Sequence, residues 1–257
     1  MNIKEQWIAY YTLTRKEVVR FLRIWPQTLI PPIITQSLYF LIFGKFIGSQ
    51  IHDIQGVSYM AFIVPGLIMM SVINNAYVNV AGSFFSSKFQ HSIEELLVSP
   101  APDWAVIAGY VTGGVLRGIL CGLLVFGVSI FFVKPAIHNL GIILVFIVLT
   151  AVVFALGGLT NGILAKKFDD VSIVPTFILT PLTYLGGVFY SIHYLPKLWQ
   201  QASRFNPILY MVNGFRFGFH GFSDVPLGDS LGILLLFTVI LTAVNLGLLK
   251  RGTGLRT

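Results

Sequence analysis

The residues best placed to do chemistry in this sequence are polar side chains inside apolar runs. Asn74, Asn75 and Asn79 share one run, and Arg117 lies near the middle of the next. A guanidinium in hydrocarbon costs several kcal/mol unless it is paired or faces water. No Asp or Glu lies at equal depth in an apolar run. Arg117 is therefore expected either to bond to backbone carbonyls and to asparagines such as Asn74, Asn75 or Asn161, or to contact an anionic substrate.

The three asparagines allow two interpretations. Side-chain amides can hydrogen-bond between neighbouring helices, or they can line a permeation path. Three amides in one run are hard to explain by packing alone, so both interpretations stay open. Glycines around Arg117 form G-x-x-x-G spacings, which let helix backbones approach closely within a protomer or across a dimer. They are Gly109, Gly113, Gly114, Gly118 and Gly122.

Signatures of catalysis and of metal binding are missing from the sequence. The five histidines have no ligand-like spacing, and a structural or solvated role is expected for each. They are His52, His91, His138, His193 and His220. The pair Gly44-Lys45 is followed by Phe46, and Tyr39 stands where a phosphate-binding loop needs glycine. We therefore expect no catalytic residue, no metal and no cofactor in this chain, so ATP and magnesium, if used, belong to a partner.

Composition shows which elements must position these groups. Hydrophobic residues make up 55% of the 257 residues and charged residues 11%, with a mean hydropathy of +0.81. A soluble protein of this composition would lack a polar surface. Because one helical crossing needs about 20 apolar residues, the sequence predicts an all-α polytopic membrane protein of six spans, forming a single domain over residues 1–257.

The apolar runs give the expected boundaries. The six transmembrane helices are predicted at about 26–48, 58–85, 104–133, 140–165, 171–189 and 230–249, and Pro31-Pro32 should kink or restart the first. Residues 2–24 mix cations with apolar residues and predict an amphipathic helix at the membrane interface. Residues 190–229 are too polar to cross and predict short re-entrant helices before the last span.

The positive charges indicate the orientation. The segments assigned inside are the richer in Lys and Arg, and they hold Lys4, Arg15, Lys16, Arg20, Arg23, Lys88, Lys166, Lys167, Lys250, Arg251 and Arg256. Those assigned outside hold Lys45, Lys134, Lys197, Arg204 and Arg216. The positive-inside rule then predicts cytoplasmic termini. The formal net charge of +7 is explained by this distribution, so a nucleic-acid partner is not expected.

The most polar interior stretch is SSKFQHSIEELLVSPAPDW, residues 86–104. Its apolar residues share one predicted helical face, and they are Phe89, Ile93, Leu96 and Leu97. Glu94 and Glu95 lie on another face, Pro100 and Pro102 end the helix, and Asp103 is placed to cap the next span. The helix is either a solvated connector or a docking helix. Paired carboxylates are a poor choice beside an anionic leaflet, which favours docking.

Four stretches together resemble the membrane subunits of type 2 ABC exporters, most closely the YadH-like bacterial inner-membrane permeases. They are FIVPGLIMMSVINNAYVNVAGSFF, IEELLVSPAP, FDDVSIVPTFILTPLTYLGGVFYSI and FNPILYMVNGFRFGF. The resemblance implies a dimer, expected to be a homodimer, that pairs with two copies of a soluble ABC ATPase. It implies a cytoplasmic coupling helix at about 87–98 and re-entrant helices at about 196–203 and 207–219.

The resemblance also implies roles for single residues. The substrate path would involve Asn74, Asn75, Asn79, Thr180, Thr183 and Tyr184, with Arg117 added from its position in the sequence. The re-entrant segment would include Asn206, Pro207, Tyr210 and Arg216. The family exports lipids, lipid-linked glycans or hydrophobic drugs.

The expected function is ATP-driven export of an amphipathic substrate across a bacterial inner membrane. One alternative is an ion-coupled secondary transporter or channel without an ATPase, which predicts ionisable residues buried in the spans. Another is a structural membrane scaffold, in which replacing Glu94 and Glu95 would affect no partner.

Overall fold

The computed structural model describes residues 2–48, 50–51 and 53–254, and the side chain of Leu97 is outside the described residues. Within these residues the fold is helical, apart from an isolated bridge between Ile54 and Val57. The helices, in chain order, are α1 (Ile3–Arg23), α2 (Trp25–Tyr39), the π-helix η1 (Phe40–Ile47), α3 (Tyr59–Phe89), α4 (Ser92–Val98), α5 (Asp103–Ser129), α6 (Leu140–Leu164), α7 (Phe168–Ile173), the π-helix η2 (Val174–Leu179), α8 (Thr180–Leu185), the 3₁₀ turn η3 (Ile192–Tyr194), α9 (Lys197–Arg204), α10 (Pro207–His220) and α11 (Leu227–Arg251).

Five helices of the described residues are long and apolar enough to cross a membrane: Trp25–Ile47, Tyr59–Phe89, Asp103–Ser129, Leu140–Leu164 and Leu227–Arg251. They match five of the six predicted spans. The predicted restart at Pro31-Pro32 is wrong, because α2 continues through both prolines. The predicted span at 171–189 is built from α7, η2 and α8 in succession, with Pro175 and Pro181 near the starts of η2 and α8.

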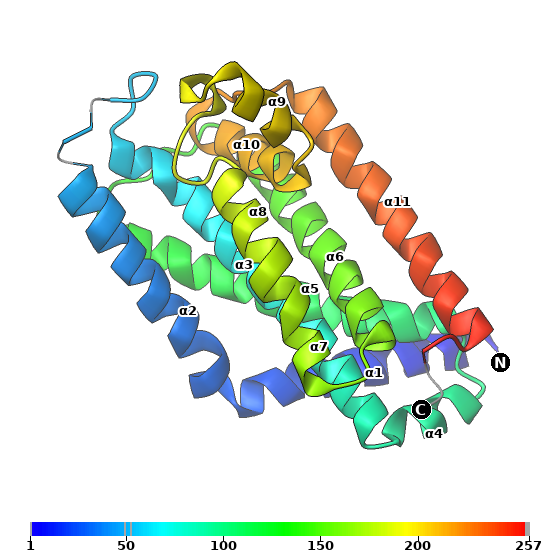
Figure 1. Cartoon of the computed structure of the whole chain (residues 1–257). Helices are drawn as coiled ribbons and strands as arrows, with labels where there is room; N and C mark the ends of the chain where they lie inside the picture. The colour runs from blue at the N-terminus through cyan, green and yellow to red at the C-terminus, as the bar shows by residue number, and fades with distance from the viewer. Residues whose placement is uncertain (1, 49, 52, 255–257) are drawn as a thin grey trace.

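The structure has two ends, which Figure 1 shows at the bottom and the top. Helix α4 and both termini lie at the bottom, where Phe168 packs edge-on against Phe89. Helices α9 and α10 lie at the top, where the amides of His138 and Asn139 donate to the carbonyl of Gly218. The run α7–η2–α8 extends between the same two ends as the five long helices.

Helix α3 is the centre of the bundle, with most of its side chains buried against α5 and α6. Small residues allow this approach: a Cβ on Gly114 or Gly118 would lie 3.0–3.1 Å from backbone oxygens of α3, and one on Gly158 of α6 only 2.3 Å from the Tyr77 carbonyl. The glycine spacing of α5 therefore serves packing within the protomer.

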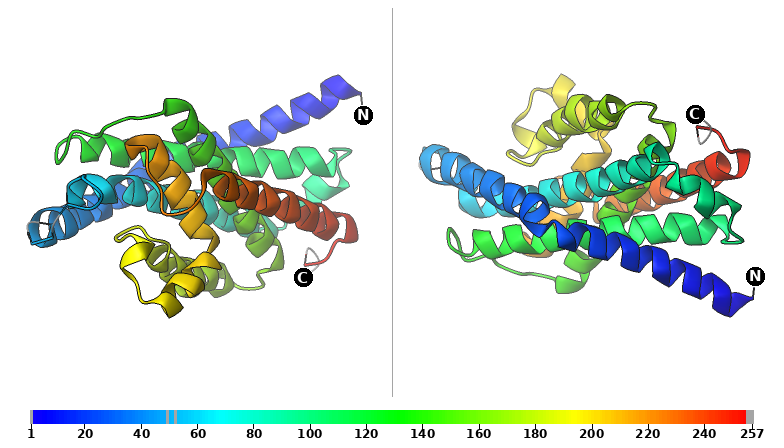
Figure 2. Two further views of the ribbon diagram at one scale, coloured as in Figure 1. Left: turned by 90° about the horizontal axis from the view of Figure 1, so that it is seen from above. Right: turned by 90° about the horizontal axis from the view of Figure 1, so that it is seen from below.

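Helix α1 runs beside α5 and is visible as the N-terminal helix in both views of Figure 2. Its first turn is closed by a capping box between Asn2 and Glu5. Trp7 packs edge-on against Trp104, and Gly109 and Gly113 of α5 face Leu13 and Glu17. The predicted interface helix at 2–24 thus exists as a helix, and one of its faces is covered by α5.

Candidate functional site

A buried charge cluster joins α1 to α3. The side chain of Glu17 is 1% exposed, and its carboxylate accepts hydrogen bonds from Arg20 at 3.0 Å and from the Ser83 hydroxyl at 2.8 Å. Arg20 also donates to the side-chain and backbone oxygens of Asn79, at 2.8 and 3.2 Å. Sequence reasoning missed this cluster, because Glu17 lies among the polar residues of an amphipathic helix and no pattern distinguishes it as the residue that meets α5.

Arg117 extends the cluster to α5. Its two Nη atoms donate to the Oδ1 atoms of Asn79 and Asn75, at 3.3 and 3.4 Å. The bond to Asn75 confirms one of the expected partners, and Asn79 is a partner that was not expected. Asn74 and Asn161 instead donate to the carbonyls of Met70 and Val171. Among the described residues no carboxylate forms an ion pair with Arg117.

The contacts of Arg117 show where it lies along the bundle. It shares Asn79 with Arg20, near the end of α1, and Cys121, one turn further along α5, lies 4.0 Å from the carbonyl of Thr28 in the first turn of α2. Arg117 is therefore level with the junction of α1 and α2. Its depth in the membrane stays a prediction, and the first half of α5 lies beside α1.

The path residues predicted on α8 lie apart from this cluster. The Thr180 and Thr183 hydroxyls donate to carbonyls of Pro175 and Leu179 in their own helical run, at 2.9 and 2.6 Å. The Tyr184 hydroxyl meets that of Tyr39 at 2.6 Å, at the end of the bundle near α9. The predicted path residues thus form two groups, one on α3 and α5 and one on α8.

The residues predicted in the re-entrant segment anchor helices. Asn206 caps α10 through Oδ1 and donates from Nδ2 to the carbonyl of Leu182 at 2.6 Å, and Pro207 is the first residue of α10. Tyr210 donates to the carbonyl of Arg204. Arg216 is fully buried, donates to the carbonyl of Gly187 at 2.6 Å and lies over the Phe62 ring at 3.9 Å.

The predicted coupling helix begins later than expected. Helix α3 continues to Phe89, the chain turns at His91 with φ of +57°, and α4 starts at Ser92. Phe89 and Ile93 therefore do not share a helical face, and Ile93 packs into the core. The capping expectation for Asp103 is also wrong, because Asp103 is the first residue of α5 after an N-cap at Pro102.

The exposed surface around α4 is therefore formed by residues of several helices. Glu94 and Glu95 are exposed on the helix, Leu96 is half-buried, and Leu97 has no described side chain. Phe89 and Phe168 pack edge-on against each other beside α4 and are about 60% exposed. Sequence reasoning missed Phe168, because it lies 70 residues beyond α4 in a different predicted loop.

The loop between α6 and α7 is closed by ionic groups. Lys88 is buried, and its ammonium donates to the carbonyls of Ile163 and Ala165, at 3.1 and 2.7 Å. Asp170 accepts hydrogen bonds from the backbone N–H groups of Lys166 and Lys167, at 2.8 and 3.0 Å. Both contacts fix the loop next to α4.

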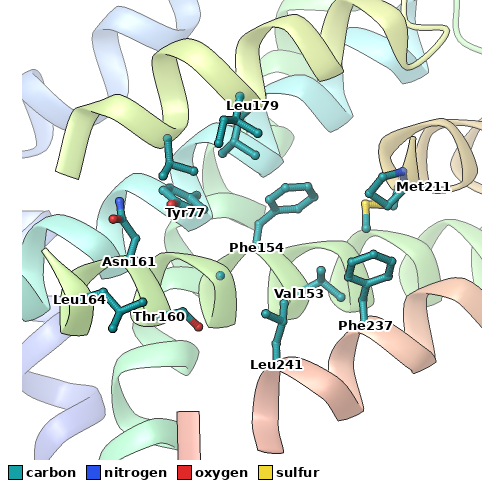
Figure 3. Close-up of a pocket in the computed structure, with 14 residues that line it drawn as sticks. Tyr77, Val153, Phe154, Thr160, Asn161, Leu164, Leu179, Met211, Phe237 and Leu241 are labelled. Carbon is teal, nitrogen blue, oxygen red and sulfur yellow. The ribbon is translucent and has the colours of Figure 1, made fainter. Parts of the chain in front are cut away.

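Two cavities in the bundle differ in chemistry. The larger, of about 460 Å³, lies between α6, η2, α10 and α11 and is lined mostly by apolar side chains such as Phe154, Met211 and Phe237 (Figure 3). The polar groups at its edge are engaged, since Thr160 bonds to Asn245 and Asn161 to a backbone carbonyl. The lining of this larger cavity suits a hydrocarbon chain. The other, of about 280 Å³, lies between α2, α3 and α5 and is lined by Arg117 and several uncharged polar side chains.

Comparisons with known proteins agree with this architecture. A model of the ABC-2 type transporter family matches residues 8–220. The chain is 58% identical to the inner membrane transport permease YadH of Escherichia coli strain K12, over 98% of each protein. It is also 24% identical to nodulation protein J of Rhizobium leguminosarum bv. trifolii, over 95% of this chain and 93% of that protein.

The family match spans most of the chain, and the relative at 58% identity is matched along nearly its whole length. The long apolar helices agree with membrane insertion. The chain belongs to the ABC-2 type transporter family and is a multi-pass inner-membrane transport permease.

Proposed function

We propose that this permease is the membrane-spanning half of an ATP-driven exporter that moves an amphipathic substrate outward. ATP and magnesium are bound by a separate ABC ATPase, present in two copies, and two permease protomers form a homodimer. The observation that carries the proposal is the exposed helix α4, held against the core of a chain whose family is defined by ABC transport.

Helix α4 is suited to transmit force because it is fixed at both sides. Ser92 donates to the carbonyl of Ser87, and the Ser87 hydroxyl accepts a bond from Tyr110 of α5. Ile93 is 1% exposed and packs against the core formed by α3, α5 and α6. A push on Glu94 or Glu95 therefore reaches three long helices. We include Phe89 and Phe168 with Glu94 and Glu95 in the docking surface.

The proposed topology has six crossings, the fifth formed by α7, η2 and α8. This run extends between the same two ends as the long helices. Both termini and α4 then face the cytoplasm, in agreement with the excess of Lys and Arg there. Helices α9 and α10 lie at the outer end, where we propose that they enter the outer leaflet from outside.

The test of coupling is charge reversal on α4. In Glu94→Lys with Glu95→Lys, we expect copurification of the ATPase to fall about tenfold, equivalent to ~1.4 kcal/mol, because two docking carboxylates become cations. The partner to tag is the ATPase with a phosphate-binding loop encoded by a neighbouring reading frame. The readout is the molar ratio of ATPase to permease after solubilisation.

A matched control reverses two exposed carboxylates at the opposite end, Asp53→Lys with Asp229→Lys, which changes the net charge equally. This control should copurify the ATPase at the wild-type ratio. An unchanged ratio in the α4 variant would contradict docking through α4. Purification with no ATPase under any condition would instead favour the ion-coupled alternative.

A further inference from the structure

The polar cavity between α2, α3 and α5 has the composition of a ligand site. Its volume is about 280 Å³. Eight of its lining residues are polar, and they are Gln27, Thr28, Thr35, Gln36, Ser71, Asn74, Asn75 and Arg117. Apolar packing would suffice to join three membrane helices. A polar cavity in this position therefore needs an explanation beyond packing.

Three polar atoms of the cavity lining lack a hydrogen-bond partner among the described residues. They are Oε1 of Gln36, Oγ of Ser71 and Nε of Arg117. Gln36 and Ser71 are 4% and 2% exposed. A buried polar group without a partner is costly, and each such group in a folded protein calls for an unobserved water, ion or ligand. Together they offer two donors, from Ser71 and Arg117, and one acceptor, from Gln36.

The charge beside the cavity is positive. Arg20 and Arg117 donate to the same oxygen of Asn79, so the two guanidinium groups are close neighbours. The carboxylate of Glu17 pairs with Arg20. Two cations and one carboxylate leave an excess of one positive charge, and Arg117 is the member that lines the cavity. An anionic ligand would neutralise it.

The position of the cavity suggests where a ligand enters. The lining residues of α2 run from Gln27, next to the junction with α1, to Gln36. In the proposed topology this junction is at the cytoplasmic face, because α1 carries the basic residues assigned inside. The cavity is then at the depth of the inner-leaflet headgroups and the first part of their chains.

We infer that this cavity binds the anionic head of an amphiphile from the inner leaflet and is the site where the permease recognises its substrate. Arg117 and Ser71 donate to the acidic group, and Gln36 accepts a hydrogen bond from a hydroxyl or amine of the head. Assigning the ligand as substrate rests on the proposed function. The binding site itself does not, since it can be tested without any ATPase.

The experiment measures ligand binding to the purified full chain in maltoside micelles by the shift of its thermal unfolding midpoint. The probes share one acyl chain and differ in the head: lysophosphatidic acid, lysophosphatidylcholine and monoacylglycerol. We expect saturable stabilisation by lysophosphatidic acid, with an affinity at least about tenfold above that for the other two. Equal affinity for the uncharged monoacylglycerol would overturn the proposal.

Variants of cavity residues, compared with a variant elsewhere, show where the ligand binds. Arg117→Gln should weaken binding of lysophosphatidic acid about tenfold or more, and Gln36→Leu should weaken it without removing charge. Arg15→Gln, on the exposed part of α1, removes the same charge and should bind as the wild type does. If Arg117→Gln fails to fold, Gln36→Leu still decides, because wild-type affinity in a folded Gln36→Leu would contradict the site.

Competition separates the sources of the anionic group. Inorganic phosphate alone should compete weakly, because it lacks the chain, and competition as strong as that of lysophosphatidic acid would overturn the amphiphile. Phosphatidylglycerol should compete less strongly than lysophosphatidic acid, because its phosphodiester carries one negative charge whereas the phosphomonoester of lysophosphatidic acid carries up to two. Strong competition by it would assign the cavity to a resident membrane lipid and overturn its role in substrate recognition, while leaving the ATPase-coupling proposal untouched.

Discussion

At the scale of single residues, glycine on α5 determines how closely α1 can pack. A Cβ on Gly113 would lie 2.5 Å from the Cβ of Glu17, and one on Gly109 would lie 2.6 Å from that of Leu13. Both contacts involve atoms next to the backbone, so a neighbouring rotamer change cannot relieve them. These two positions therefore hold Glu17 where it reaches Arg20 and Ser83.

Replacing one of these glycines should separate the helices. Gly113→Ala is expected to lower the free energy of unfolding by about 1–3 kcal/mol, as overpacking does, and to loosen the bonds of Glu17. Gly127→Ala on the same helix has nothing within 4 Å of the new methyl group, so its helix propensity should make it neutral or stabilising by up to ~1 kcal/mol. The check is reversible unfolding in mixed micelles, and equal stabilities of the two variants would refute the packing role.

Sequence reasoning found part of the charge cluster at this scale. Arg117 and Asn75 stood out because each interrupts an apolar run, and the structure brings them together. Glu17 and Arg20 did not, since charges are ordinary in a basic amphipathic helix. Which face of such a helix is covered depends on its partner. Here that partner is the small-residue face of α5, about a hundred residues away.

At the scale of elements, Lys88 connects the end of α3 to the end of α6. Its ammonium bonds two carbonyls that the helix terminus leaves without partners, those of Ile163 and Ala165. A lysine at this place suits the negative end of the helix dipole. The contact lies between the start of α4 and the loop that carries Phe168, so it joins the two parts of the proposed docking surface.

Lys88→Met should free this loop while leaving Glu94 and Glu95 of the docking surface in place. Loss of a charged donor to two carbonyls is worth about 1–3 kcal/mol, so amide exchange at residues 164–168 should become faster. ATPase copurification should persist, while stimulation of the ATPase by the permease should fall. Lys250→Met, an exposed lysine near the C-terminus, is the control. Unchanged exchange in Lys88→Met would show that the bonds do not hold the loop.

The helical elements were largely predictable, and their interruptions were less so. Long apolar runs gave α3, α5, α6 and α11 to within a few residues, because a membrane span needs a fixed length. The break at His91 was not predictable from the pattern, since Phe89 to Leu97 fits one helical face. It arises from a left-handed backbone at a residue other than glycine. The packing of Ile93 in the core and the hydrogen bond from Ser92 to Ser87 stabilise this break.

At the scale of the whole molecule, the two ends of the bundle alternate along the chain. Helix α3 begins where Ala61 meets His220 and ends beside Phe168. The chain returns through α5, and α6 ends at the carbonyls bound by Lys88. The run α7–η2–α8 then leads back to the Leu182 carbonyl, where Asn206 holds α10. Six crossings require this alternation. It predicts, for each loop, the side of the membrane on which the loop lies.

Cysteine labelling tests this topology. Cys121 is the only cysteine of the sequence and is buried, so a Cys121→Ala background gives a chain without thiols. Single cysteines at Val98, Phe131 and Phe205 replace side chains that are 87–90% exposed. A membrane-impermeant maleimide applied to intact cells should label Phe131→Cys and Phe205→Cys, and should label Val98→Cys only after the cells are opened. With α7–η2–α8 as the fifth crossing, Phe205 lies outside. If that run did not cross, Phe205→Cys would behave as Val98→Cys does. Five crossings would then place the N-terminus and the C-terminus on opposite sides of the membrane.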